Sequence, residues 1–185
     1  GLSTTANVEA AQRLLAEAGY PNGEGFPTLR LGYYTDTVVK KVAEAMQQMF
    51  KQNLNIDLEI TTADWAVYYE QVQAGDYDIA AMGWGADYLH PMSFLPLFET
   101  GSTQNYSNYS NPEYDALVEQ ARVEPDAQTA MDLMRQAEAL MMEDYPFIPV
   151  FYRSYPMMMQ TYVKGWSRSP LNYFYLQHAY VEAAA

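Results

Sequence analysis

The sequence contains no cysteine and only two histidines, His90 and His178. Without cysteine the chain has no disulfide, no thiolate metal site and no cysteine nucleophile. Two histidines cannot build a multi-histidine metal centre, and Asp76, Asp78 and Asp87 lack the spacing of a calcium-binding loop. We therefore expect the protein to bind no metal ion and to carry no cofactor.

Positive charge is also scarce. Only 10 lysines and arginines stand against 23 acids, which gives a formal net charge of -13. Nucleic-acid recognition needs clustered Lys and Arg against phosphates, so the composition argues against a nucleic-acid partner. It also argues against docking on an anionic membrane surface. No stretch of the sequence approaches the ~20 consecutive apolar residues of a membrane-spanning helix.

The chain does have the composition of a folded domain. Its 185 residues are 49% hydrophobic, which is enough for one domain with a substantial core. Alternating apolar residues predict three strands, over 29–34, 56–61 and 77–82. Polar capping residues precede three predicted helices: Asn7, Asp36, and either Thr62 or Asp64. This order predicts an α/β fold, with a central, mostly parallel sheet flanked by helices.

The second half shows a different pattern. Asn111 and Asp126 are predicted to cap two further helices. The apolar run over 147–152 predicts a buried strand. From Tyr155 onward the periodicity loosens, in a stretch rich in methionine and tyrosine. We therefore expect a folded lobe over 1–154 and an irregular carboxyl-terminal tail over 155–185.

The most informative segment spans 77–88, with the sequence YDIAAMGWGADY. An apolar, strand-like run ends in Gly-Trp-Gly and is followed by an acid beside an aromatic residue. Ligands of open α/β sheets bind beyond the carboxyl ends of the strands, on loops that a rigid scaffold positions. The candidate ligand-binding residues are those at this end of the segment: Met82, Trp84, Gly85, Ala86, Asp87 and Tyr88.

Other interpretations of these residues stay open. Trp84 is as typical of a core aromatic as of a pocket wall, and Met82 fits a buried strand position. Asp87 could also cap a turn of its own loop. Gly83 and Gly85 would allow a ligand backbone to approach closely.

Motifs spread over most of the chain share one resemblance. They are the helix ending in Ala18-Gly19-Tyr20, the pair Asp64-Trp65, the segment Gly83-Trp84-Gly85-Ala86-Asp87 with Pro91, Ser93, Phe94 and Leu95, the run Asn111-Pro112-Glu113-Tyr114-Asp115, and the run Pro146-Phe147-Ile148-Pro149-Val150-Phe151-Tyr152. In this order they resemble the family 5 solute-binding proteins. These are the extracytoplasmic oligopeptide- and dipeptide-binding receptors of ABC importers.

The resemblance implies a periplasmic-binding-protein-like lobe that is not an enzyme and lies outside the cytoplasm. Family members are longer and have two lobes that close on the ligand. Residues 1–154 resemble only the carboxyl-terminal ligand-binding lobe, and 155–185 a segment that returns toward the missing amino-terminal lobe. The implied partners are a peptide ligand and the membrane permease of an ABC importer. The exposed cleft face could also support self-association.

In the family, an acid at the position of Asp87 holds the ammonium group of the peptide's first residue. Some members have Arg where this chain has Ala81, and an acid is common where it has His90, so the preferred peptide length stays open. One alternative is a family 5 receptor for a sugar, a nickel complex or haem. The other is a glycosidase-like enzyme, which needs two carboxylates ~5–10 Å apart, whereas the sequence nominates only Asp87. Nucleophile-elbow and phosphate-loop patterns are absent, so we expect no catalytic residues.

Overall fold

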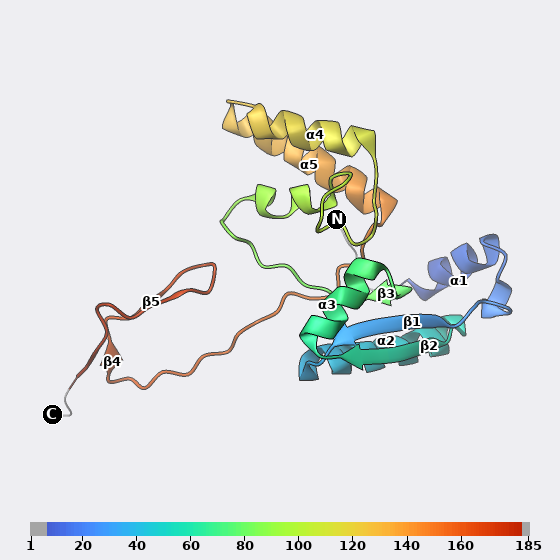
Figure 1. Ribbon diagram of the computed structural model, residues 1–185, viewed down its shortest axis with the longest axis horizontal. Helices are drawn as coiled ribbons and strands as arrows, with labels where there is room; N and C mark the ends of the chain where they lie inside the picture. Colours follow the sequence, from blue (N-terminus) through green and yellow to red (C-terminus); the bar gives the residue numbers. More distant parts are fainter. Residues whose placement is uncertain (1–6, 183–185) are drawn as a thin grey trace. The chain divides into compact units, whose positions relative to one another are not determined.

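The computed structural model describes residues 7–182 (Figure 1). The chain forms two compact units: the first unit, Gly1–Gly83, and the second unit, Trp84–Ala185. Each unit has a hydrophobic core of its own. Within 7–182, no helix is both long enough and apolar enough to cross a membrane.

A three-stranded parallel sheet forms the centre of the first unit, in the order β2-β1-β3. Its strands are β1 (Leu29–Tyr34), β2 (Leu58–Ala63) and β3 (Ile79–Ala80). The chain steps from β1 to β2 and then back past β1 to β3. Right-handed crossovers therefore place the two connecting helices on opposite faces of the sheet. The predicted α/β fold with a parallel sheet is confirmed.

Alternate residues of β1 face the helices on the two sides of the sheet. α2 (Thr37–Leu54) and α3 (Trp65–Ala74) both pack on the sheet, and α1 (Val8–Glu17) packs against α2 (Figure 1). The core on the α2 side consists of Leu31, Tyr33, Val39, Ala43, Ile56 and Leu58. The other face of β1 meets α3: the Tyr34 ring lies 6.1 Å from the Tyr68 ring, and a Cβ atom added at Gly32 would point at the same ring, as the two-residue period of a strand requires.

Polar caps begin these helices where the sequence predicted them. Asn7 and Asp36 each accept hydrogen bonds from backbone amides in the first turn of α1 and α2. Asp64, not Thr62, precedes α3, but its side chain makes no capping hydrogen bond. Gly75 ends α3 in the left-handed conformation, which glycine adopts without steric strain.

β2 starts two residues later than predicted, at Leu58 instead of residue 56. The amide of Ile56 donates to the carbonyl of Phe50 at 3.3 Å, so this residue closes the end of α2. A backbone group used in a helix cap cannot also serve a strand ladder, and pairing with β1 therefore begins only at Leu58.

β3 is also shorter than predicted, with two residues in place of the span 77–82. At its start, the carboxylate of Asp78 accepts a hydrogen bond from the Arg30 amide at 2.7 Å. The Asp78 amide still donates to the Arg30 carbonyl at 3.2 Å, so a side chain replaces only the bond that the Arg30 amide would make to the backbone. At its end, the Ala81 amide donates to the Gly32 carbonyl at 2.9 Å, and the pairing of β3 with β1 ends there.

The second unit is built around a helical hairpin, α4 (Pro112–Val123) and α5 (Ala127–Asp144). The short connection over 124–126 makes the two helices antiparallel neighbours (Figure 1). Asn111 and Asp126 cap them as predicted. Two short 3-10 helices precede the hairpin, η2 (Pro91–Ser93) and η3 (Leu95–Phe98). The core joins η3 to both helices through Leu95, Tyr114, Val118, Ala121, Ala130, Met134, Ala137 and Met141.

The predicted buried strand over 147–152 is wrong. The segment is irregular, and its apolar side chains from Ile148 onward are exposed, with Tyr152 fully so. A strand forms only where a neighbour accepts and donates its backbone hydrogen bonds. Along the described chain, no segment pairs with 147–152.

The tail contains two very short antiparallel pairs within otherwise irregular chain. β4 (Val163–Lys164) pairs with β7 (Tyr180–Val181), and β5 (Ser167–Arg168) pairs with β6 (Phe174–Tyr175). The division between a lobe over 1–154 and a tail over 155–185 stays a prediction. Residues 1–6 of the predicted lobe and residues 183–185 of the predicted tail lie outside the described part of the chain.

Candidate functional site

The predicted ligand residues lie in the segment 82–88, which follows β3 and has no regular secondary structure. Because β3 runs parallel to β1, the chain leaves the sheet here at its carboxyl edge. Open α/β sheets bind ligands at this edge. The boundary between the units falls after Gly83, so Met82 belongs to the first unit. Trp84, Gly85, Ala86, Asp87 and Tyr88 belong to the second.

The solvent exposure of these side chains distinguishes a core role from a role in lining a binding site. The side chain of Trp84 is 45% exposed and that of Tyr88 is 51% exposed. A core role for Trp84 is therefore unsupported. Met82 and Ala86 are half-buried, and Met82 lies outside β3 instead of within a buried strand.

Asp87 is exposed, and it forms no hydrogen bond or ion pair with any other described residue. The turn-capping interpretation thus finds no support. The surrounding sequence adds no basic group, because no lysine or arginine occurs between Lys51 and Arg122. An acid in such a basic-free stretch is available to a cationic group of a ligand.

Two glycines flank Trp84 without a packing reason of their own. A Cβ atom added at Gly83 or Gly85 would meet no atom within 4 Å. Neither glycine has a positive φ angle. Bare backbone beside an exposed aromatic residue leaves room for the backbone of a ligand.

Ser93 is a residue of this region whose role sequence reasoning missed. It is only 5% exposed. Its hydroxyl donates to the carbonyl oxygen of Tyr88 at 2.8 Å and accepts from the Tyr88 amide at 3.2 Å. The available signal was Pro91, which starts the short helix η2 and brings Ser93 back to Tyr88.

Tyr68 was missed as well, and it supports the strand that leads to the segment. Its buried hydroxyl lies 3.0 Å from the carbonyl oxygens of both Gly32 and Ala81. Burial raises the pKa of Tyr68, so the hydroxyl stays protonated and able to donate. A Cβ on Gly32 would lie 3.2 Å from the Tyr68 ring, which explains the glycine in mid-strand. Tyr68 thus fastens the end of β3 to β1.

An aromatic cluster extends the carboxyl edge of the sheet in the first unit. Tyr34 is the last residue of β1, and its ring meets Trp65 edge-to-face at 5.2 Å. Trp65 in turn stacks on Tyr69 at 5.5 Å. About half of the Trp65 side chain is exposed, so this edge of the sheet presents an aromatic surface.

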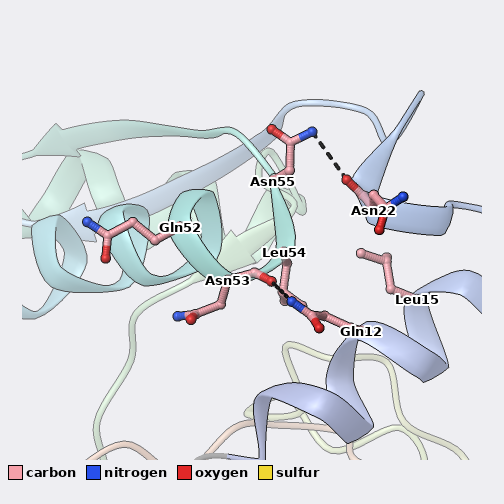
Figure 2. A pocket seen from close by; sticks show the side chains of 7 residues that line it. All are labelled: Gln12, Leu15, Asn22, Gln52, Asn53, Leu54 and Asn55. Carbon is pink, nitrogen blue, oxygen red and sulfur yellow. Dashed lines mark hydrogen bonds between the residues drawn. The ribbon is translucent and has the colours of Figure 1, made fainter.

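The first unit also contains a depression of about 190 Å³ on another side (Figure 2). It lies among α1, the 3-10 helix η1 (Pro21–Gly23) and the end of α2, and is lined by Gln12, Leu15, Asn22, Gln52, Asn53, Leu54 and Asn55. Hydrogen bonds from Gln12 to Asn53 and from Asn55 to Asn22 cross it. These residues precede β1 and β2, so the depression lies at the amino edge of the sheet, away from the edge where 82–88 begins.

The residues needed for a metal site are not gathered in the part of the chain that the structure describes. Throughout 7–182, no group of three or more histidine, aspartate or glutamate residues is placed to hold a metal ion.

Comparison with known proteins identifies the family. A family model described as bacterial extracellular solute-binding proteins, family 5 Middle, matches residues 2–106, which is more than half of the chain. The chain belongs to this family. The match includes the sheet, both crossover helices and the whole of the segment 82–88.

Family 5 relatives of known name align over nearly the whole chain. The dipeptide-binding protein DppE of Bacillus subtilis is 35% identical over 92% of this chain and 32% of its own length. The crystal structure of Haemophilus influenzae OppA in complex with RPPGFSPFR is 34% identical, with a TM-score of 0.83 over 95% of this chain and 35% of that one. The chain thus spans about a third of the length of these relatives.

Not every family 5 relative is named for peptides. A probable deoxycholate-binding periplasmic protein of Escherichia coli is 30% identical over 95% of this chain and 33% of its own length. Membership of the family therefore does not by itself define the ligand.

Proposed function

We propose that this chain is the carboxyl-terminal ligand-binding lobe of a family 5 receptor that captures peptides for an ABC importer. The observation that carries the proposal is Asp87, an exposed and unpaired acid in the segment that leaves the sheet at its ligand-binding edge. Its proposed role is to hold the ammonium group of the peptide's first residue.

The chemistry of the segment fits a peptide. A charge-assisted hydrogen bond between a carboxylate and an ammonium group contributes about 1.5–3 kcal/mol. It sets the position of the peptide without selecting its side chain. Backbone near Gly83 and Gly85 is open to pairing with an extended peptide, in the manner of strand addition. Met82, Trp84, Ala86 and Tyr88 then form walls around the first peptide residues.

The proposed partners follow from this role. The peptide is held between this lobe and an amino-terminal lobe, and the loaded receptor delivers it to a membrane permease. The protein works outside the cytoplasm, performs no catalysis and needs no cofactor. The exposed aromatic residues Trp84 and Tyr88 give the isolated lobe a surface for weak self-association.

A receptor for a non-peptide solute is the second candidate. The deoxycholate-binding relative favours it, because that protein aligns over the same part of the family. Sugars and haem carry no ammonium group, and nickel complexes need other ligands, so none of these solutes would use Asp87 in the proposed way. The preference for a free amine therefore discriminates between the two candidates.

Calorimetric titration of the complete receptor tests the proposal. We expect short peptides with a free amino terminus to bind about ten to a hundred times more tightly than the same peptides with an acetylated terminus. Equal affinities would overturn the role of Asp87. No binding of either class, with binding of a sugar, nickel complex or haem, would favour the second candidate.

A further inference from the structure

We infer that Ser93 is a positioning residue for Asp87, which it orients through the backbone of Tyr88. The inference rests on the proposed function, because it concerns the same amine-binding acid. The observation behind it is that one buried hydroxyl contacts both backbone polar groups of the residue that follows Asp87.

The hydrogen-bonding capacity of serine matches this arrangement. A serine hydroxyl has one proton to donate and lone pairs to accept with. Here the proton goes to the Tyr88 carbonyl at 2.8 Å, and the oxygen accepts from the Tyr88 amide at 3.2 Å. Both peptide groups next to Tyr88 are therefore held by the same side chain.

The amide in question belongs to the peptide group that joins Asp87 to Tyr88. Because peptide groups are planar, a hydrogen bond that holds this amide restricts the rotation about the bond between Cα and the carbonyl carbon of Asp87. The Asp87 side chain makes no hydrogen bond with any described residue that could orient it directly. The held backbone on its carboxyl side limits where the bond from Cα to Cβ of Asp87 points, and the side-chain torsions set the direction of the carboxylate from there.

Further hydrogen bonds through His90 tie Ser93 and Tyr88 into one turn. The Ser93 amide donates to the His90 carbonyl at 3.0 Å, and the His90 amide donates to the same Tyr88 carbonyl at 2.8 Å. His90 Nδ1 accepts from the Met92 amide at 3.3 Å. Ser93 is buried and both of its hydrogen bonds with Tyr88 are partly buried, so water competes with them less than in open solvent.

A positioning role predicts a change in amine preference, not only in stability. In the complete receptor, Ser93→Ala should lower the ratio of affinities for free and acetylated peptides by about threefold to tenfold, which corresponds to about one ordinary hydrogen bond. Ser93→Thr keeps the hydroxyl and should restore most of the ratio. In an Asp87→Asn background, Ser93→Ala should leave the ratio unchanged.

Tyr114→Phe is the matched control. The Tyr114 hydroxyl is also buried and donates to a backbone carbonyl, that of Leu95, at 2.6 Å. Its removal should lower stability as Ser93→Ala does, yet leave the ratio intact. Equal weakening of both peptide classes by Ser93→Ala, or an equal drop in the ratio with Tyr114→Phe, would overturn the inference. If the unmodified receptor shows no amine preference, the proposed function fails first and the inference falls with it.

Discussion

At the residue scale, the central question is what an unpaired acid contributes. Asp87 lies exposed within a stretch of sequence that has no lysine or arginine between Lys51 and Arg122. In open solvent such a carboxylate is hydrated, and an ion pair there contributes little. The same group becomes valuable when a ligand and a second surface exclude water, because Coulomb attraction then strengthens. Asp87 is therefore suited to a site that closes.

Replacement of Asp87 measures this contribution directly. In the complete receptor, Asp87→Asn should weaken peptides with a free amino terminus by about ten- to a hundredfold, the loss of one charge-assisted hydrogen bond. Acetylated peptides have no ammonium group and should bind as before. Glu138→Gln removes the same charge from the exposed face of α5 and serves as the control. If Asp87→Asn weakens both peptide classes equally, the acid shapes the loop instead of holding the amine.

At the scale of elements, features that depend on neighbouring residues could be predicted from the sequence. Features that depend on contacts between distant residues could not. Asn7, Asp36, Asn111 and Asp126 are read from a few neighbouring residues, and all four cap helices. The extent of β3 depends on Asp78 meeting Arg30, which is 48 residues away in the sequence. The segment 147–152 has a strand pattern but no partner along the described chain.

The same distinction between local and distant contacts applies to the residues of the candidate site. The segment 82–88 could be predicted because its composition and its place after a strand are local properties. Ser93 and Tyr68 could not, since serine and tyrosine are common in many environments. Only the fold brings the Ser93 hydroxyl to Tyr88 and the Tyr68 hydroxyl to two carbonyls.

The bond between α3 and the end of β3 can be tested by removing one oxygen. Tyr68→Phe should lower the free energy of unfolding by about 1–2 kcal/mol, because the buried contact with the Gly32 carbonyl and the partly buried contact with the Ala81 carbonyl both lose their donor. Tyr33→Phe, in β1, is the control, since the Tyr33 hydroxyl bonds to no other residue of the described chain. Urea unfolding of the 185-residue chain gives both values. Equal effects of the two changes would contradict the tie between β3 and β1.

The end of α5 makes a pH-dependent contact with the loop before α4. Hydrogen bonds from the Tyr109 hydroxyl at 2.7 Å and the Asn111 amide at 2.8 Å lower the pKa of Asp144 below its usual 3.8. Burial and the same contact raise the pKa of Tyr109 to about 12. The Asp144 contribution is therefore complete above pH 3.8 and is lost as the pH falls through the lower, folded-state pKa.

Two substitutions test this linkage. Asp144→Asn and Tyr109→Phe should both reduce the acid-induced loss of stability, because each removes a member of the contact that protonation breaks. The Tyr109 contribution has the opposite sign: it is present below pH 10 and is lost as the pH rises toward about 12. Unfolding curves recorded across both pH ranges measure these slopes. If stability falls equally steeply with acid in the unmodified chain and in Asp144→Asn, the contact of Asp144 with Tyr109 is not the cause of that fall.

At the scale of the whole molecule, the chain spans about a third of the length of its relatives. Two features of the second unit agree with the proposal that this chain is one lobe of a larger receptor. The apolar side chains over 148–152 are exposed, and so are many aromatic residues of the tail, including Tyr173, Phe174 and Tyr180. A ligand held between two lobes would likewise meet only half of its contacts on this chain.

That division sets the expected affinity of the isolated chain. If a complete receptor binds a peptide with a dissociation constant of ~1 μM, about -8 kcal/mol, then half of the contacts leave about -4 kcal/mol, or ~1 mM. The loss should be greater still for the amine contact, since Asp87 stays hydrated without a second lobe and its ion pair is weak in water. We expect the 185-residue chain to fold and to bind short peptides barely or not at all. Titration of the same peptides against the isolated chain and the complete receptor checks this. Low-micromolar binding by the isolated chain would mean that the whole site lies within it, and that the proposal of one lobe of a clamp is wrong.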